Sequence, residues 1–255
     1  MNKTEFFEVC TTCVPQASRQ GGDYLDEHRM RLWSTFKVCE ELLQPGDSII
    51  SVGAGSAYVE HALHRAKKVQ VTVVDFPEAI QAHAKEYARS EFRTVAADLT
   101  RPLDIPPRFD LALSCEIIEH IPRDPQLHIS LLAGFLAPAS PRGYMVVTTP
   151  NFGNVRNIVK LAMMRPIMPP ASRVFGDVCY ENEGVHRREY LPSEIISCMD
   201  KAGLRHIHTY YTENEEAHSL KNRVGSVASK IAGRFAQTMI VVGRRKSVAE
   251  GAAGR

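Results

Sequence analysis

Short apolar runs alternate with amphipathic stretches along most of this chain, and that alternation limits its possible folds more than any other feature. Runs rich in β-branched residues predict buried strands. They are DSIISVG, VQVTVVDF, RTVAADL, FDLALSC and GYMVVTTP, at residues 47–53, 69–76, 93–99, 109–115 and 143–150. Most of the segments between them have helical spacing. Strands that are apolar throughout, separated by amphipathic helices, indicate an α/β fold with a doubly wound parallel sheet.

The rhythm changes after Pro150, where a stretch rich in proline and methionine has no strand pattern. We interpret this stretch as a helical cap or lid inserted into the domain. A helix and two closing strands follow it. The predicted organisation is an N-terminal helical segment at 1–35, a core at 36–150, the cap insert at 151–184, the C-terminal part of the same domain at 185–245, and a flexible tail at 246–255.

The composition limits the classes of partner that this protein can have. The net charge of +2 gives no argument for nucleic acid or a membrane as partner. The first residues lack the apolar stretch of a signal peptide, and no run approaches the ~18 apolar residues of a spanning helix. Cys10 and Cys13 have metal-ligand spacing, but no second such pair follows, which argues against a zinc site. Six scattered cysteines predict reduced thiols and a cytoplasmic location.

Glycines and acids stand where the first three predicted strands end. Gly53 and Gly55 follow the first strand, where a tight turn and a close backbone approach require glycine. Asp75 ends the second strand, about 20 residues later, where an acid can accept hydrogen bonds from a ribose. Asp98 ends the third strand. Since ligands of open α/β sheets bind at the carboxyl edge, these positions predict nucleoside binding.

These motifs resemble the class I S-adenosylmethionine-dependent methyltransferases. The similarity is carried by ISVGAGSAYVE, VVDF, AADL, FDLALSCEIIEHIP, MVVTTPN and HRREYLPSEIISCMDKAGL, within residues 36–245. The resemblance implies a Rossmann-like, seven-stranded sheet, mostly parallel with an antiparallel last strand. It also implies that residues 36–150 form a core that binds S-adenosylmethionine.

The resemblance assigns cofactor contacts to the carboxyl ends of the strands. They are Gly53, Ala54 and Gly55 under the methionine part, Asp75 at the ribose, Phe76 along the adenine, Asp98 at its amine, Leu99 at its face, and Cys115 near the sulfonium. Two positions depart from the family, since Ser51 stands where an acid is usual and Ala57 where a third glycine is usual. Both residues are small, so the turn can still form. The missing acid removes an anchor for the ammonium of the cofactor.

The segment SCEIIEHIP, residues 114–122, brings Glu116, Glu119 and His120 together after the fourth strand. If the segment is helical, their spacing places them on one face, toward the active-site crevice. His120 can act as a general base. The three side chains can also hold Mg²⁺ or another divalent ion. The E-x-x-E-H pattern is similar to that of ubiquinone-pathway and small-RNA 2′-O-methyltransferases. The resemblance to small-RNA 2′-O-methyltransferases implies that His186 completes the metal site. Packing beside the cofactor, without a metal, is the alternative.

The basic residues and the apolar residues of the 151–184 insert can each be interpreted in two ways. Its basic residues suit an anionic acceptor, or simply form a solvated helix; they are Arg156, Lys160, Arg165 and Arg173. Its apolar stretch at 158–164 is too short to span a membrane, but could touch one or face an apolar acceptor. Asn151, in TTPN at the end of the fifth predicted strand, either binds the acceptor or caps the next helix.

The function predicted from these features is O-methylation of a small molecule or a sugar by S-adenosylmethionine. The alternative within the class is metal-dependent methylation of a quinone-type acceptor or an RNA 2′-hydroxyl. Low net charge disfavours nucleic acid. An inactive cofactor-binding partner or regulator is the alternative from another class, and a nicotinamide dehydrogenase is weakened by the missing third glycine. The sequence leaves the oligomeric state open.

Overall fold

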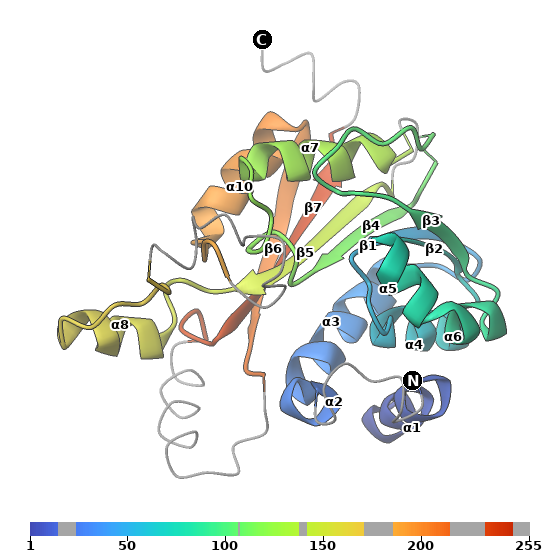
Figure 1. Cartoon of the computed structure of the whole chain (residues 1–255), viewed down its shortest axis with the longest axis horizontal. Helices are drawn as coiled ribbons and strands as arrows, with labels where there is room; N and C mark the ends of the chain where they lie inside the picture. The colour runs from blue at the N-terminus through green and yellow to red at the C-terminus, as the bar shows by residue number, and fades with distance from the viewer. Residues whose placement is uncertain (15–23, 107, 138–141, 171–185, 215–232, 247–255) are drawn as a thin grey trace.

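A mixed sheet forms the centre of the molecule in the computed structural model, which describes residues 1–14, 24–106, 108–137, 142–170, 186–214 and 233–246. The seven strands lie in the order β3-β2-β1-β4-β5-β7-β6 (Figure 1). Their bounds are β1 Ser48–Val52, β2 Gln70–Asp75, β3 Arg93–Ala96, β4 Leu111–Cys115, β5 Tyr144–Pro150, β6 Leu204–Thr212 and β7 Thr238–Arg245.

Strand directions confirm the predicted fold class. The strands from β3 to β5 pair in parallel, whereas β7 is antiparallel to both β5 and β6. The residues of β1, β2 and β4 are buried almost throughout. They are apolar at nearly every position because helices cover both faces of the sheet, and not one face alone.

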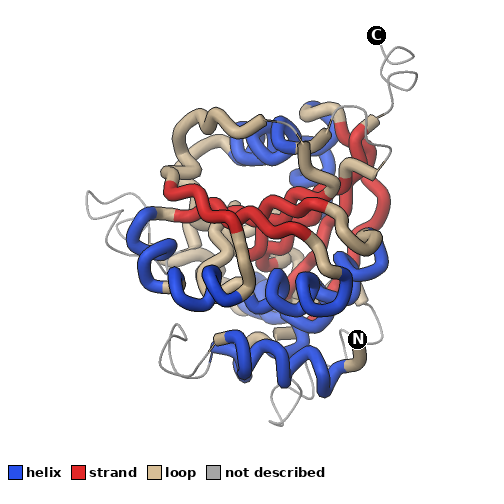
Figure 2. The backbone as a smooth tube through the Cα atoms, turned by 90° about the vertical axis from the view of Figure 1, so that its right-hand side faces the viewer, coloured by secondary structure: helices blue, strands red, loops and turns tan. Residues whose placement is uncertain are grey.

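Helices flank the sheet on two sides (Figure 2). Their bounds are α1 Lys3–Cys13, α2 Tyr24–Glu27, α3 Arg29–Leu42, α4 Tyr58–Lys67, α5 Pro77–Ala82, α6 Ala84–Arg89, α7 Pro125–Phe135, α8 Val155–Ala162 and α10 Pro192–Lys201. One apolar core joins α1, α3 and α4 to the sheet, and includes Phe6, Phe36 and Leu63. A second core, with Leu132 and Met199, joins α7 and α10 to the other face.

The local sequence and backbone explain where α7 begins and why the helix after β2 is interrupted. Pro125 opens α7, and the Asp124 carboxylate accepts a hydrogen bond from the Gln126 N–H at 2.9 Å, as the sequence predicts for an N-cap. The segment between β2 and β3 forms two short helices, α5 and α6, that meet at His83. The backbone of His83 has φ −110° and ψ 12°, outside the helical region, and this interrupts the helix.

The order of the strands reverses between β1 and β4, which are neighbours with Val52 beside Ser114. Ligands of open α/β sheets bind outside the carboxyl ends of strands at such a point. The chain that follows β5 forms α8, the described part of the predicted cap. Residues 171–184 of that insert and 247–255 of the predicted tail lie outside the described residues. Within the described ranges, no helix is long and apolar enough to cross a membrane.

Candidate active site

The turn after β1 has the tight geometry that its glycines predict. Gly53 and Gly55 have φ values of +65° and +50°. A Cβ atom on Gly53 would lie 2.2 Å from Cδ1 of Ile117, so a larger residue would displace the Ile117 side chain. Ala57, which replaces the usual third glycine, also adopts a left-handed conformation with φ 49°. The turn therefore forms despite this departure. It packs directly against residues 116–120, which we call the E-I-I-E-H segment.

Asp75 lies at the end of β2 beside this turn, as predicted. Its Oδ2 accepts a hydrogen bond from the Gly55 N–H at 3.1 Å, and its Oδ1 accepts one from the Phe76 N–H at 2.8 Å. The carboxylate thus fixes the glycine turn. Phe76 is 45% exposed, which leaves its ring accessible. The ribose and adenine contacts of these two residues stay predictions.

The remaining predicted cofactor residues differ in exposure. Asp98 accepts hydrogen bonds from the N–H and hydroxyl of Thr100 at 2.8 and 2.7 Å, and these bonds lower the pKa of its carboxyl. Leu99 is buried and packs in the second core. Cys115 ends β4, and burial raises the pKa of its thiol well above the usual value. A thiol kept protonated in this way is no nucleophile.

The E-I-I-E-H segment, residues 116–120, is not helical, so the condition for one shared helical face is not met. Glu116 has φ 55°, and bends and turns occupy residues 116–120. The left-handed backbone at Glu116 stops β4 without starting a helix. As a consequence, Glu116 and Glu119 point to different partners.

Glu116 forms a buried ion pair with the N-terminal segment. Its Oε2 lies 2.6 Å from Nη1 of Arg31 on α3, and its Oε1 accepts a hydrogen bond from the Thr148 hydroxyl at 2.9 Å. The guanidinium of Arg31, only 4% exposed as a residue, also donates to the Tyr24 hydroxyl at 2.6 Å. This pairing makes Glu116 a structural anchor between α3 and the sheet.

The side chain of Glu119, in the same segment, is fully buried. Its Oε2 accepts a hydrogen bond from the Thr149 hydroxyl at 2.9 Å. Its Oε1 is buried and has no hydrogen-bond partner among the described residues. Burial, together with the nearby Glu116 carboxylate, raises the pKa of Glu119 well above its usual value. A buried carboxylate oxygen without a donor is costly, and it is a position at which a cation would be stabilising.

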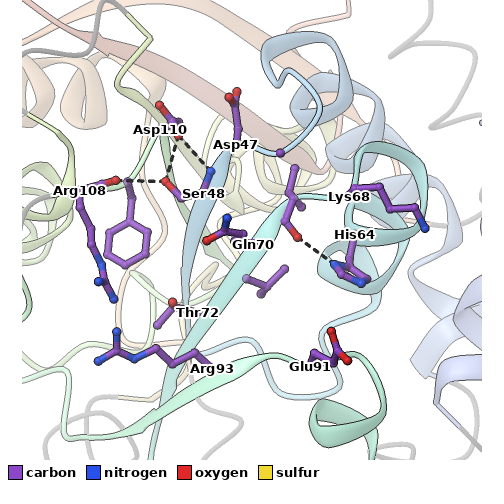
Figure 3. Close-up of a pocket in the computed structure, with 14 residues that line it drawn as sticks. Asp47, Ser48, His64, Lys68, Gln70, Thr72, Glu91, Arg93, Arg108 and Asp110 are labelled. Atoms are coloured by element: carbon purple, nitrogen blue, oxygen red, sulfur yellow. Dashed lines mark hydrogen bonds between the residues drawn. The ribbon is translucent and has the colours of Figure 1, made fainter.

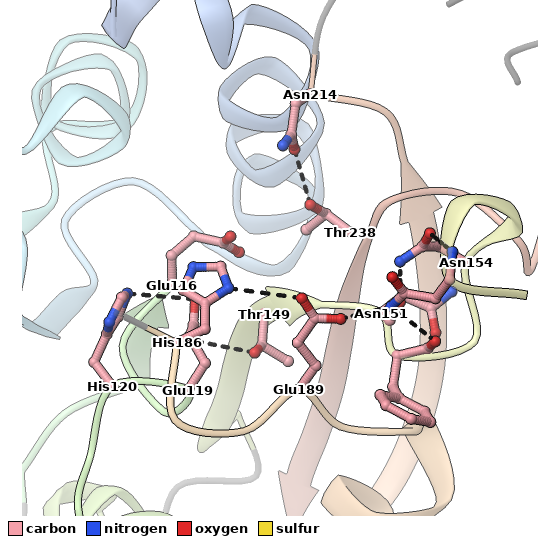
Figure 4. A network of polar contacts seen from close by, with 12 residues as sticks. Glu116, Glu119, His120, Thr149, Asn151, Asn154, His186, Glu189, Asn214 and Thr238 are labelled. Carbon is pink, nitrogen blue, oxygen red and sulfur yellow. Dashed lines mark hydrogen bonds and ion pairs between the residues drawn. The ribbon is translucent and has the colours of Figure 1, made fainter. Parts of the chain in front are cut away.

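Three side chains converge around that oxygen (Figure 4). Ligand atoms of Glu119, His120 and His186 all lie within 4.8 Å of one another. The two imidazole rings meet edge to face, with centroids 4.9 Å apart. Behind them, Nδ1 of His186 lies 3.7 Å from the Glu189 carboxylate. The structure therefore brings together three of the four predicted metal ligands, and Glu116 is held apart by Arg31.

The loop that carries His186 is fixed to the segment after β4. The N–H of Arg187 donates to the carbonyl of Glu119 at 2.8 Å, and Nε of Arg187 donates to the carbonyl of His120 at 3.1 Å. Contacts between residues this distant in the chain give the cluster a defined geometry. The sequence pattern could not predict these two hydrogen bonds.

Two functional candidates escaped sequence reasoning. Arg31 gave no signal, because nothing in the sequence of α3 sets it apart. Glu60 did give one, since it falls in the first turn of α4 close to the glycine turn. Its buried carboxylate accepts a hydrogen bond from the Ser51 hydroxyl at 2.5 Å. A carboxylate therefore lies against the position where the family usually carries an acid, but it comes from the helix.

Asn151 fits neither of its predicted roles. Its amide donates to the carbonyls of Arg234 and Ala236, and its Oδ1 accepts from the Gly153 N–H. The cap of α8 is Asn154, whose Oδ1 accepts from the Asn157 N–H at 3.0 Å. Asn151 thus ties the end of β5 to the start of β7.

A cleft of about 650 Å³ opens at the opposite edge of the sheet, at the amino ends of β1 and β2 (Figure 3). Several of its polar groups have partners: Asp110 accepts from the N–H and hydroxyl of Ser48, and Asp47 pairs with Arg142 at 3.1 Å. Nδ1 of His64 lies 2.8 Å from the carbonyl of Val69. This cleft is remote from the glycine turn, so we do not assign it to the cofactor.

The strand order, the antiparallel β7 and the glycine turn at the reversal point define the class of this protein as a Rossmann-like methyltransferase. A family model described as a methyltransferase domain matches residues 23–209. The chain therefore belongs to that family. The family and the fold together imply S-adenosylmethionine as the methyl donor. No curated protein matches the chain in sequence.

Solved structures share the fold at low sequence identity. A chain from the complex of the Haloferax volcanii Trm112 methyltransferase activator with a protein assigned as a methyltransferase has a TM-score of 0.62 and 16% identity, covering 93% of this chain and 97% of that one. Geranyl diphosphate C-methyltransferase from Streptomyces coelicolor has a TM-score of 0.57 and 14% identity, with 84% and 80% covered. The 4+2 cyclase SpnF has a TM-score of 0.57 and 14% identity, with 84% and 81% covered.

Proposed function

We propose that the protein transfers a methyl group from S-adenosylmethionine to a hydroxyl of a small molecule or a sugar. The observation that carries this proposal is the convergence of Glu119, His120 and His186 beside the glycine turn. A nitrogen or thiolate nucleophile needs little help to attack a sulfonium methyl group. A hydroxyl must lose its proton, and this cluster offers the groups for that task.

The transfer is an in-line displacement. A bond forms between the acceptor oxygen and the methyl carbon, the bond between that carbon and sulfur breaks, and the electron pair stays on sulfur. His120, whose side chain is 28% exposed, would take the proton of the hydroxyl. Glu119 would hold the imidazole from the buried side, and the more exposed His186 would help to hold the acceptor.

The cluster also fits a divalent ion. Oε1 of Glu119, which has no hydrogen-bond partner in the described part of the chain, and two imidazoles are a set of one carboxylate and two histidines. That donor set suits a first-row transition ion better than Mg²⁺, which prefers oxygen ligands. When bound, such an ion would lower the pKa of an acceptor hydroxyl.

Isothermal titration calorimetry with Mn²⁺ tests this metal site without any turnover. We expect the wild-type protein to bind the ion, and His186→Ala or Glu119→Gln to weaken binding by about 100-fold, because each removes one ligand. His206→Ala, on β6, is the matched control and should leave the affinity unchanged. A wild-type protein that binds neither Mn²⁺ nor Zn²⁺ would refute the metal site and leave His120 as the base.

The fold alone does not choose the acceptor. The neighbouring structures include a C-methyltransferase solved with Mg²⁺ and geranyl diphosphate, and a cyclase. A quinone-type or RNA 2′-hydroxyl acceptor with a metal is the second candidate, favoured by the same cluster. A catalytically inactive partner is the third, and the neighbour bound to a methyltransferase activator makes a protein partner part of that candidate.

Labelled methyl transfer into a fractionated cell extract tests the main proposal. The methyl group of S-adenosylmethionine carries the isotope, and the NMR shift of the product distinguishes oxygen, nitrogen and carbon attachment. We expect a methyl ether in a small-molecule or sugar fraction. A carbon-attached or nitrogen-attached product, or label confined to RNA, would reject the proposal.

We further propose that Glu60 replaces the missing acid of the first strand in anchoring the cofactor ammonium. Support comes from its bond to Ser51 and from its burial beneath the glycine turn. Glu60→Ser should weaken binding of S-adenosylhomocysteine by about tenfold, the size of a charge-assisted hydrogen bond. The exchanged variant Ser51→Asp/Glu60→Ser should regain most of that affinity.

Calorimetry measures both variants, and their melting temperatures check that they fold. Equal affinity for Glu60→Ser and the wild-type protein would remove Glu60 from the cofactor site. If the exchanged variant binds as weakly as Glu60→Ser, the carboxylate is not acting in place of the strand acid.

A further inference from the structure

Helix α8 carries an apolar surface that methyl transfer does not use. Val155, Ile158, Val159 and Ala162 follow the i, i+3, i+4, i+7 spacing that puts side chains on one face of a helix. Ile158 and Val159 are both exposed. In a helix packed on a core, this face would be covered. Here it is open to solvent.

The exposed apolar side chains continue to the end of the helix and past it. Leu161 is 55% exposed and Met164 is 93% exposed, with the exposed Met163 between them. Figure 1 shows α8 standing out from the sheet and its flanking helices. Contiguous exposed apolar side chains of this kind mark an interaction surface.

Positive charge borders this apolar surface. Arg156 and Lys160 lie on the other side of the helix, Arg165 follows it, and all three are exposed. The sequence from 152 to 170 contains no aspartate or glutamate. Lysine and arginine beside an apolar helix face are typical of helices that lie in the interface of an anionic bilayer.

We propose that α8 and residues 163–165 dock the protein on the surface of an anionic lipid bilayer. The apolar side chains would enter the acyl boundary, and the cations would meet the lipid head groups. A groove on another protein would require the apolar face, but would not account for charged side chains that are all basic within residues 152–170. The charge pattern therefore favours lipid.

The base of α8 is fixed to the body of the protein. The Asn157 amide donates to Oε2 of Glu189 at 2.7 Å, and the other oxygen of Glu189 lies 3.7 Å from His186 (Figure 4). A docked helix would thus hold the active-site cluster at a set orientation to the membrane. Docking itself needs neither cofactor nor turnover, so its test is independent of the proposed methyl transfer.

Co-sedimentation with vesicles tests the proposal. We expect the wild-type protein to bind vesicles of phosphatidylcholine with phosphatidylglycerol, and to bind vesicles of phosphatidylcholine alone at least about tenfold more weakly. Leu161→Ser/Met164→Ser should lower binding to the anionic vesicles by about tenfold. Lys160→Glu/Arg165→Glu should remove the preference for anionic lipid.

Leu127→Ser is the matched control, because Leu127 is 56% exposed on α7, away from α8. It should bind vesicles as the wild-type protein does. Absence of wild-type binding, or an equal loss in the control, would overturn the proposal. So would sedimentation velocity showing that α8 variants separate a dimer while vesicle binding is unchanged, since α8 would then contact a second copy.

Discussion

Replacing His120 by alanine should lower kcat by about 100-fold to 10,000-fold, the contribution of a general base to proton transfer. The affinity for S-adenosylhomocysteine should change by less than about twofold, because the predicted cofactor contacts, at the glycine turn and Asp75, do not include His120. Single-turnover methyl transfer and calorimetry, measured on the same preparation, check the two expectations separately.

His208→Ala is the control for this variant. His208 lies on the edge strand β6, is exposed, and should leave both quantities unchanged. Turnover that survives in His120→Ala would rule out His120 as the base. A parallel loss of cofactor affinity would instead indicate that His120 supports the binding site and not the chemistry.

Replacing Arg31 by alanine should destabilise the fold by about 3–5 kcal/mol, because the substitution leaves the Glu116 carboxylate buried without its cation. The two groups are 2.6 Å apart, and their side chains are 5% and 15% exposed. Urea unfolding, followed by circular dichroism, measures the change in the free energy of unfolding.

Lys246→Ala is the control, because it removes an ion pair with the same distance between its charged atoms but with much greater exposure to solvent. Lys246 and Asp200 are also 2.6 Å apart, yet the Asp200 side chain is 70% exposed, so the loss should be under about 1 kcal/mol. Arg31→Ala/Glu116→Gln should recover part of the stability, since it removes both charges. If Arg31→Ala costs no more than Lys246→Ala, the buried pair does not anchor α3.

The sheet and its carboxyl edge could be predicted because short stretches of sequence, the apolar runs and the glycine turn, indicate them. Strands buried on both faces must be apolar at nearly every position, and this pattern is visible at 47–53 and 69–76 without any knowledge of contacts. The glycine turn follows the first of these strands directly. A parallel sheet then brings the strand ends to one edge, whichever helices intervene.

The sequence left open whether residues 116–120 are helical, and the structure shows that they are not. Spacing at i, i+3 and i+4 is compatible with a helix, but it does not require one. The left-handed backbone of Glu116 and the packing of Ile117 against Gly53 decide the path of the chain here. Helical spacing over so few residues carries too little information to outweigh such a tertiary contact.

The sequence by itself determined the α/β class, the turn at Gly53, the acid at Asp75 and the presence of carboxylates and imidazoles after the fourth strand. Only the tertiary structure decided their roles. It paired Glu116 with Arg31, left Glu119 with His120 and His186, and placed Glu60 against Ser51. The physical reason is that periodicity and turn chemistry act between near neighbours, whereas charge pairing and burial depend on which distant segments the fold brings into contact.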